Sequence, residues 1–495
     1  MYGVFGQTAC EGRLWSRSVA AVPRSSAIAL RLAAFASVAL MFACGPKPSA
    51  STPPAATDAP PSSEAAPQTP TTTAAPPVLL RGARVMTAAG VIYERGDVLL
   101  RDGKVEAVGA QLQAPQGVAV IDAAGKTITP GIIDTHSHIG VYASPALSAH
   151  SDGNEMSAAT TPQVRAADGY WPQDPQIDLA RAAGVTTMQI LPGSANLIGG
   201  QSVVVRTTVG ARTVDDARFV GAPTGLKMAC GENPKRVHGE KGGPMTRMGN
   251  MAGFRTAFQK ATEYKRKRAA WERKKGEEDA GGPPDRDLGL EALVGVLDGT
   301  ILVHNHCYRA DDMLGMLALA DEFGFEIRSF HHAVEAYKIA DRLAEAGVSA
   351  SMWADWWGFK AEAYDSIRAN AAIVSSQGAR AIIHSDSAQG IQRLNQEAAK
   401  AKAAGERAGL PISEDEALRW ITANAAWALG IEDVTGTLEA GKMADVVVWS
   451  GDPLSVYSHA ERVYLGGALV YDRNDPKQQP HTDFLVGQPA QGDLR

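Results

Sequence analysis

The sequence predicts an α/β fold in which a (β/α)8 TIM barrel carries a small composite β-sandwich domain built from both ends of the mature chain. Two observations predict it. Apolar strand-like runs alternate with helix-like segments over residues 131–434, as expected of a parallel sheet closed by crossover helices. Short strand-like runs bounded by glycine lie on either side, at 78–130 and 435–475, and both have the same hairpin texture.

The composition of the 495-residue chain limits its partners. A formal net charge of -6 at pH 7 gives no electrostatic reason to expect nucleic acid as a partner. A highly charged stretch at 255–287 contains a basic cluster, and its default interpretation is a solvated helix inserted beside the barrel.

Residues 1–43 have the pattern of a lipoprotein-type signal peptide. They carry arginines with Glu11 as the only acid, and the apolar run at 32–43 suits a signal-peptide core better than a bilayer span. The run ends in "LMFACG", which resembles a bacterial lipobox with Cys44 as the lipidated residue. We therefore expect membrane attachment through a lipidated Cys44.

Residues 44–77 are almost wholly proline, alanine, serine and threonine. Such a stretch cannot bury enough apolar surface to offset its chain entropy, which predicts a disordered tether. The order of signal, cysteine and tether predicts an exported, membrane-anchored lipoprotein on the periplasmic or cell-surface side. Residues 476–495 are expected to be a C-terminal tail.

The stretch "PGIIDTHSHIG" at 130–140 places His136 and His138 one residue apart after an apolar run. Side chains alternate along a strand, so both rings project from one face. Two adjacent imidazoles repel each other when protonated, and a shared cation is the natural reason to keep them together.

Four more polar residues follow or end apolar runs. They are Lys227 in "GLKMA", His304 in "ILVHNH", His332 in "IRSFHH" and Asp386 in "IIHSDS". Because the ends of barrel strands meet at one face, the six candidates together predict a metal site there.

These motifs resemble the amidohydrolase superfamily, within its imidazolonepropionase-like and dipeptidase-like branch. The resemblance runs from about residue 78 to 475 and includes the closing stretch "TANAAWALGIEDVTGTLEAGKMADVVVW". It implies a metal-dependent hydrolase that holds one or two divalent ions. Zinc is the first expectation, and Mn, Co or Fe stay open because all accept this ligand set.

The resemblance also implies a role for each position. His136 and His138 match the pair that binds the more buried metal, and His304 and His332 match the ligands after the fifth and sixth strands. Asp386 matches the aspartate after the eighth strand, which binds metal and accepts a proton from the attacking water. Asp386 and His332 form the expected catalytic set.

Lys227 matches the lysine that binuclear members carry as a CO2 adduct bridging two metals. Glu232 is an alternative metal ligand, and a site that uses neither residue is also open. Lys235 and Arg236 are candidates to bind a substrate carboxylate, since guanidinium binds carboxylates with two hydrogen bonds, although they could equally pair with surface acids.

Three other histidines lie near the proposed ligands. His306 and His331 sit beside them, and an immediate neighbour in an extended segment faces the other way. His384 lies two residues from Asp386 and could support it from behind. None of the three enters the predicted ligand set.

The implied function is hydrolysis of a C–N bond in a small amide, cyclic amide or dipeptide-like molecule, with Asp386 as general acid and base. The alternatives are a mononuclear ring hydrolase of the imidazolonepropionase type, a lactonase or esterase on the same site, or a tethered binding protein without turnover. Deaminases of this superfamily place a glutamate three residues after the fifth-strand histidine, where this chain has Cys307, so deamination is not expected. A disulfide between Cys230 and Cys307 and a homo-oligomer both stay open.

Overall fold

The computed structural model describes residues 75–277, 281–356 and 358–480. The expected signal peptide, Cys44, nearly all of the tether and the tail beyond residue 480 lie outside the described residues. Within the described part, none of the helices combines the length and the apolar character that crossing a bilayer requires.

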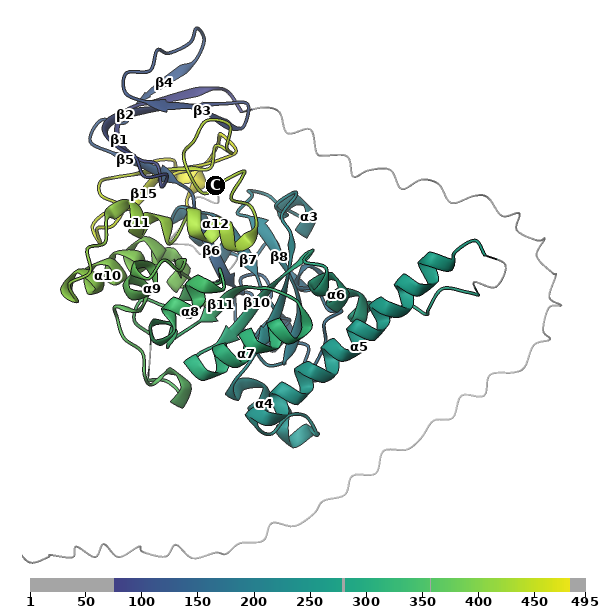
Figure 1. Cartoon of the computed structure of the whole chain (residues 1–495). Helices are drawn as coiled ribbons and strands as arrows, with labels where there is room; N and C mark the ends of the chain where they lie inside the picture. The colour runs from purple at the N-terminus through teal and green to yellow at the C-terminus, as the bar shows by residue number, and fades with distance from the viewer. Residues whose placement is uncertain (1–74, 278–280, 357, 481–495) are drawn as a thin grey trace, which may run out of the picture. The chain divides into compact units, whose positions relative to one another are not determined.

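Eight strands form the barrel sheet, and their order in space is their order in the chain (Figure 1). They are β6 (Ile132–Ser137), β7 (Val185–Ile190), β8 (Ile198–Arg206), β9 (Thr224–Ala229), β10 (Ile301–Cys307), β11 (Ile327–His332), β12 (Ser349–Met352) and β13 (Ala381–Ile383). The predicted α/β barrel is thus confirmed. Its strands supply the buried apolar layer expected of such a core, with Val185, Leu226 and Phe330 fully buried.

One strand departs from the all-parallel expectation, because β8 runs antiparallel to both β7 and β9. Only residues 191–197 separate β7 from β8, which is too short for the crossover that a parallel neighbour needs. The reversal brings the start of β8 to the same end of the barrel as the later part of β9. There Gly200 pairs with Lys227 in the strand register.

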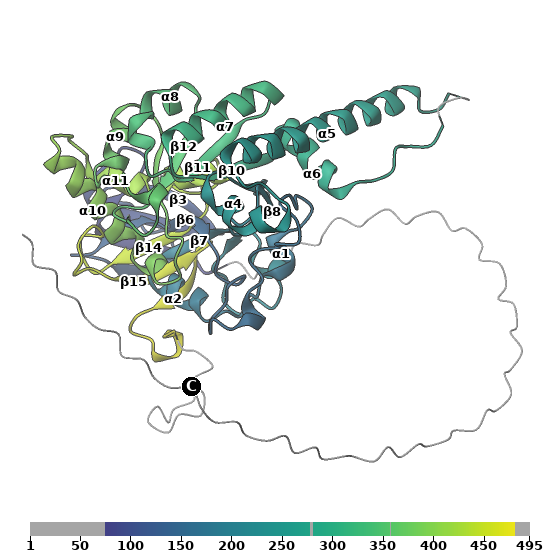
Figure 2. The same cartoon turned by 90° about the horizontal axis from the view of Figure 1, so that it is seen from below.

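Helices surround the barrel strands (Figures 1 and 2). They are α1 (Ala166–Gly169), α2 (Gln176–Ala182), α3 (Val214–Ala217), α4 (Glu232–His238), α5 (Arg247–Lys274), α6 (Leu288–Leu297), α7 (Ala310–Phe323), α8 (Ala340–Glu345), α9 (Asn370–Ser376), α10 (Leu394–Arg407), α11 (Glu414–Arg419) and α12 (Ala423–Leu429). The α7 helix, which directly follows β10, is 14 residues long and buries one apolar stripe against the barrel.

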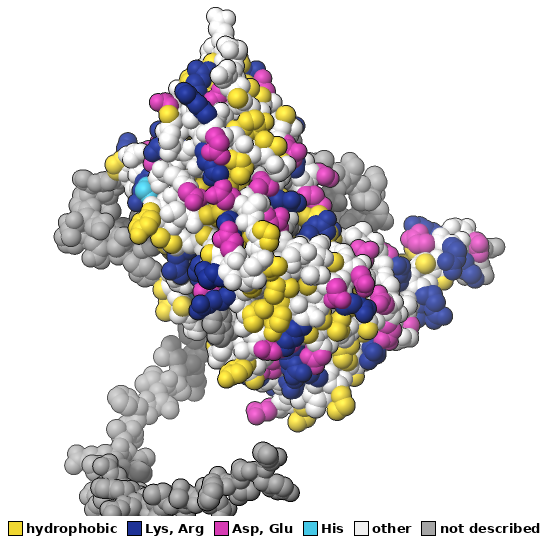
Figure 3. All heavy atoms as spheres, turned by 60° about the vertical axis from the view of Figure 1, so that its left-hand side comes forward, with side chains coloured by type: hydrophobic (Ala, Val, Ile, Leu, Met, Phe, Trp, Pro, Cys, Tyr) yellow, Lys and Arg dark blue, Asp and Glu magenta, His cyan; other side chains and the backbone are white. Residues whose placement is uncertain are grey.

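The charged stretch forms the greater part of α5, which confirms an inserted helix there. The Thr246 hydroxyl caps the helix by accepting a hydrogen bond from the Gly249 backbone N–H. Phe254, Phe258 and Ala261 form the buried stripe. The far end of α5 extends away from the barrel, and acidic and basic side chains are interspersed over it (Figure 3).

The two ends of the described chain form one further sheet with mixed strand directions. Its strands are β1 (Val78–Met86), β2 (Ile92–Arg101), β3 (Lys104–Gly109), β4 (Ala119–Asp122), β5 (Thr127–Pro130), β14 (Val446–Trp449), β15 (Ala460–Leu465) and β16 (Ala468–Asp472). Antiparallel pairing of β5 with β14 joins the N-terminal strands to the C-terminal ones. This confirms a composite β-domain, whose strands form a single hydrogen-bonded sheet.

We expect the stability of this sheet to depend on its own core. Leu80 on β1 is fully buried, whereas Leu469 on β16 is 41% exposed. Leu80→Ala should lower the free energy of unfolding by about 2–5 kcal/mol, because it removes buried methyl groups and leaves a cavity. Leu469→Ala is the matched control and should change it by less than about 1 kcal/mol. Urea unfolding of both variants measures this, and equal losses would contradict the assigned core.

Candidate metal centre

The candidate site begins where the first and last barrel strands meet. Asp134 on β6 is fully buried, and its Oδ1 accepts hydrogen bonds of 3.1 Å from the backbone N–H groups of His136 and Ser385. Its other oxygen accepts from the Ser385 hydroxyl. The Asp386 backbone N–H donates to the His136 carbonyl oxygen at 2.9 Å. Burial raises the pKa of Asp134 to about 7, against the opposing effect of these hydrogen bonds.

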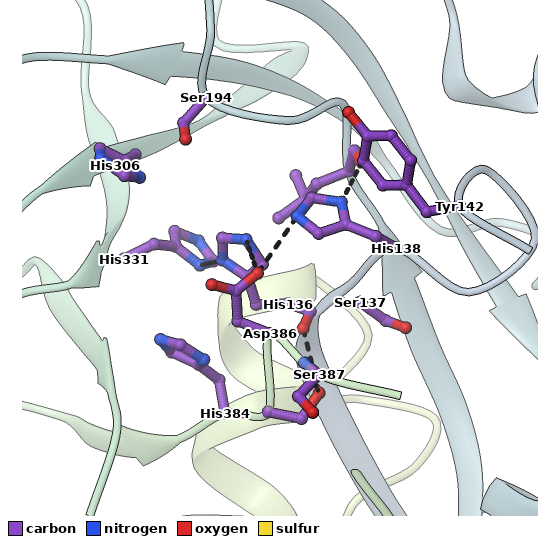
Figure 4. A network of polar contacts seen from close by, with 12 residues as sticks. His136, Ser137, His138, Tyr142, Ser194, His306, His331, His384, Asp386 and Ser387 are labelled. Carbon is purple, nitrogen blue, oxygen red and sulfur yellow. Dashed lines mark hydrogen bonds and ion pairs between the residues drawn. The ribbon is translucent and has the colours of Figure 1, made fainter. Parts of the chain in front are cut away.

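These bonds bring Asp386 against the histidine pair (Figure 4). The Asp386 Oδ1 lies 3.3 Å from the His138 Nε2 and 3.5 Å from the His136 Nε2. The three residues offer ligand atoms that all lie within 4.8 Å of one another. Burial opposes ionisation of Asp386, yet the His138 hydrogen bond and the nearby positive charges hold its pKa below the ordinary value.

His138 presents a defined nitrogen to this cluster. Its Nδ1 lies 2.8 Å from the Leu191 carbonyl oxygen, which can only accept. When the ring is neutral, as a metal ligand must be, its proton is therefore on Nδ1, and the lone pair on Nε2 faces Asp386 and His136. This is the arrangement in which a histidine binds a metal.

The backbone turns sharply at two of the predicted site residues. His332 has φ of 68° and Asp386 has φ of 50°, both in the left-handed region that non-glycine residues rarely adopt. At His332 the turn ends the strand alternation of β11. His331 and His332 consequently both lie within reach of His136, at ring-centroid distances of 4.8 and 4.7 Å. Unusual backbone of this kind concentrates at functional sites.

A second group of nitrogens lies beside the first. His136, His332 and His384 also offer nitrogens within 4.8 Å of one another. The His306 ring centroid is 4.5 Å from that of His332. Among the described residues, the buried Nδ1 atoms of His306, His332 and His384 have no hydrogen-bond partner. Burial lowers the pKa of His136 and His332 well below the ordinary value, which leaves the neutral rings that bind metals.

Lys227 lies within this group, as the sequence predicts. It is on β9, only 1% exposed, and its Nζ is 3.3 Å from the His136 Nε2. Burial lowers the pKa of Lys227 to about 7, and the Asp386 carboxylate opposes that shift. A large share of the amine is therefore uncharged at neutral pH, and the uncharged amine is the form that reacts with CO2.

The structure does not bring His304 into the cluster. It lies level with Lys227 in the register of β9 and β10, and its Nδ1 is 2.9 Å from the His331 Nε2. His306, two residues on, faces the same way but lies nearer the mouth of the barrel. A short imidazole at the His304 level stays below the cluster, whereas the long Lys227 side chain reaches it. Since two-residue spacing keeps a face, the "HNH" motif could have pointed to His306 as well.

Glu232 also lies outside the cluster. It begins α4, and its carboxylate is 3.6 Å from the Lys360 Nζ. Arg236, on the same helix, lines the pocket above the cluster, and Lys235 does not. The helix turns neighbouring side chains about 100° apart, which separates these two basic residues.

The pocket has a volume of about 240 Å³ and opens above the cluster. Its lining consists of His136, His138, Ser194, Asn233, Arg236, His306, Tyr308, His332, Phe359, Lys360 and Asp386. Trp353 stacks on the His332 ring behind it, with the ring centroids 4.4 Å apart. Sequence analysis missed Ser194, Asn233, Tyr308, Phe359 and Lys360, which come from loops or short helices with no spacing pattern of their own.

The disulfide left open by the sequence is present in the structure. It joins Cys230 and Cys307, whose Cα atoms are 5.3 Å apart, at the ends of β9 and β10. The Cys230 backbone N–H also donates to the His306 carbonyl oxygen at 2.9 Å. The disulfide therefore links β9, which carries Lys227, to β10, which carries His306.

Comparison with known proteins shows similarity to a family model, to two proteins of known sequence and to one solved structure. A family model described as "Amidohydrolase family" matches residues 322–471. The chain is 36% identical over 439 residues to "Amidohydrolase tasK" of Hapsidospora irregularis, covering 82% of this chain and 44% of that protein. It thus spans under half the length of that relative. It is 26% identical over 421 residues to an imidazolonepropionase of Mesorhizobium japonicum, covering 78% of this chain and 94% of that enzyme.

A solved structure supports the same assignment over its whole length. The crystal structure of an amidohydrolase from Thermotoga maritima superimposes with a TM-score of 0.73 at 37% sequence identity. The match covers 80% of this chain and 100% of that one. With a barrel of this topology and a histidine cluster able to hold a metal, the chain belongs to the amidohydrolase superfamily of metal-dependent hydrolases.

Proposed function

We propose that the protein hydrolyses a C–N bond in a small amide, a cyclic amide or a dipeptide-like molecule, with water activated at a divalent metal centre. The observation that carries this proposal is the convergence of His136, His138, Lys227 and Asp386 below a single pocket. Their donor types suit zinc first, and Mn, Co or Fe are accepted by the same set.

The residues present fit such a metal. Asp386 and the Nε2 atoms of His136 and His138 would hold one ion. The Nδ1 atoms of His306 and His332, which have no hydrogen-bond partner among the described residues, would hold a second. Lys227, as its CO2 adduct, would bridge the two ions as an anionic ligand. When bound, a divalent ion supplies a Lewis acid for the scissile carbonyl and a lowered pKa for water. This arrangement replaces His304 by His306 in the set expected from the sequence.

Asp386 is the proposed general base and acid. Its pKa is held below the ordinary value, so its carboxylate is ready to accept a proton from the attacking water. The resulting hydroxide adds to the carbonyl carbon. The C–N bond then breaks, and Asp386 returns the proton to the leaving nitrogen.

The pocket lining favours a substrate with a carboxylate near the scissile bond. Arg236 and Lys360 both line it, and no ion pair joins Arg236 to an acid among the residues the structure describes. Lys360 is partly compensated by Glu232 and Glu362, each 3.6 Å away. A guanidinium free to bind two oxygens is the stronger candidate for carboxylate recognition.

A mononuclear ring hydrolase is the second candidate, supported by the imidazolonepropionase similarity over nearly that whole enzyme. A lactonase or esterase would use the same groups. Deamination is not supported, because neither Cys307 nor Arg309, three residues after His304 and His306, is an acid. Lipid attachment through Cys44 and an exported location remain predictions, as does a homo-oligomer.

The Lys227 bridge predicts the metal content of the full chain purified without chelator. Elemental analysis should find about two equivalents in the parent protein and at most one in Lys227→Ala, because the variant lacks the bridging ligand. Lys126→Ala, in the turn before β5 and paired with Glu461 of the terminal sheet, should keep the parent content. One equivalent in both parent and Lys227→Ala would overturn the bridge and favour the mononuclear ring hydrolase.

Replacing the proton-transfer group should separate chemistry from folding. Asp386→Asn should lower kcat by about 10²- to 10⁴-fold on the best substrate of a panel of dipeptides, cyclic amides and lactones. Its circular dichroism should match that of the parent, since Asp386 joins the barrel through its backbone N–H. An unchanged rate would contradict the role of Asp386, and turnover of lactones alone would replace the C–N bond assignment.

Arg236 and Lys235 form a matched pair for testing substrate recognition. Arg236→Gln should raise KM by about tenfold for panel substrates that carry a carboxylate and leave their amidated analogues little changed, because only a charge-assisted pair is lost. Lys235→Gln should behave as the parent, since Lys235 does not line the pocket. Steady-state kinetics of both variants, on each carboxylate substrate and on its amidated analogue, measures these changes in KM. Equal effects on both substrate forms would contradict carboxylate binding.

A further inference from the structure

We infer that His331 and His304 are positioning residues for His136, acting through a chain of hydrogen bonds below the metal centre. The inference rests on the proposed function, because it takes His136 as a metal ligand. The His331 Nδ1 lies 2.9 Å from the His136 Nδ1, and the His331 Nε2 lies 2.9 Å from the His304 Nδ1. All three side chains are buried, at 1% exposure or less.

Metal binding fixes the direction of these hydrogen bonds. The His136 Nε2 faces Lys227 and Asp386, so it is the nitrogen available to a metal, and a neutral ring then carries its proton on Nδ1. That proton is donated to the His331 Nδ1. His331 therefore carries its own proton on Nε2 and donates it to the His304 Nδ1. The opposite direction would place a proton on the His136 Nε2 and block ligation.

The two histidines of the pair differ in what holds them. His138 donates to the Leu191 carbonyl oxygen, which can only accept and therefore fixes the tautomer alone. His136 faces a ring that can either donate or accept, so its tautomer depends on His331. His331 in turn depends on His304 in the same way. The tautomer of His136, and with it the availability of its Nε2 to a metal, therefore depends on His331 and, through His331, on His304.

The inner end of the chain shows that His304 is held from one side. Its Nε2 is buried and has no hydrogen-bond partner within the described part of the protein. Among the described residues, the hydrogen bond with His331 is therefore the one that holds this ring. A histidine that only filled space here would leave both ring nitrogens buried without a hydrogen bond. The hydrogen-bond chain from His136 through His331 to His304, called the relay below, gives one of them a partner.

The test measures zinc affinity of the full chain by competition with a chromophoric chelator. His331→Leu removes the acceptor of His136 and should weaken zinc binding by about 10- to 100-fold, the usual effect of losing such a supporting group. His304→Leu acts through His331 and should weaken binding by a smaller factor. His331→Gln should recover most of the affinity, because its carbonyl accepts from His136 and its amide donates to His304.

His238→Gln is the matched control. His238 is also a buried histidine, at 2% exposure, but it bonds to the Asn196 Oδ1 at 2.9 Å outside the cluster. Zinc affinity should stay at the parent value in this variant. The Tm of each metal-free protein is recorded alongside, so that a change in affinity is compared at known stability.

The outcomes separate the two proposals. A parent protein that binds no zinc overturns the metal centre itself. A parent that binds zinc, with His331→Leu and His304→Leu at parent affinity, overturns the relay and leaves the centre standing. Equal losses in His331→Leu and His331→Gln would mean that ring packing is responsible. If His331→Leu does not fold, His304→Leu decides, since the hydrogen bond of the His304 ring goes to His331 and not to His136 among the described residues.

Discussion

The buried carboxylate of Asp134 is the constraint on which the site depends. It bonds to the backbone of its own strand at His136 and to both the backbone and the hydroxyl of Ser385 after the last strand. No ladder pairs β6 with β13 among the described strands, so these bonds join the two edges of the barrel sheet. These donors offset part of the cost of burying the carboxylate, a cost that would be higher for an unpaired one.

The location of the metal centre follows from that junction. Once Ser385 is attached to Asp134, the Asp386 backbone N–H reaches the His136 carbonyl oxygen, and its side chain turns back over the histidine pair. The left-handed backbone of Asp386 is part of this turn. Residues that are about 250 positions apart in the chain therefore meet because the Asp134 carboxylate and the His136 carbonyl oxygen both bond to the segment after the last strand.

The strands beneath the pocket do more than hold ligands. Lys227 lies level with His304 in the strand register, and its longer side chain reaches the cluster. The disulfide at the ends of β9 and β10 links these two strands covalently. His331 and His304 form a buried polar layer below the cluster, and a hydrogen bond between His331 and His136 connects the two. The polar layer proposed to support the metal thus lies on the inside, and Arg236, the proposed substrate contact, lines the pocket with the loops on the outside.

The sequence by itself determined the fold class, the composite terminal sheet and most of the cluster, because these depend on local patterns. Strand–helix alternation predicts a barrel, two-residue spacing puts His136 and His138 on one face, and polar strand ends locate Lys227, His332 and Asp386. Such patterns follow from the backbone geometry of a single element.

Only the tertiary structure decided the reversal of β8, the choice of His306 over His304 at the pocket, and the inward position of His331. Each of these depends on how far a side chain lies along the barrel, or on a left-handed turn such as that at His332, and neither is encoded in spacing. The same holds for Phe359 and Lys360, since a loop reaches the pocket only through the packing of the elements around it.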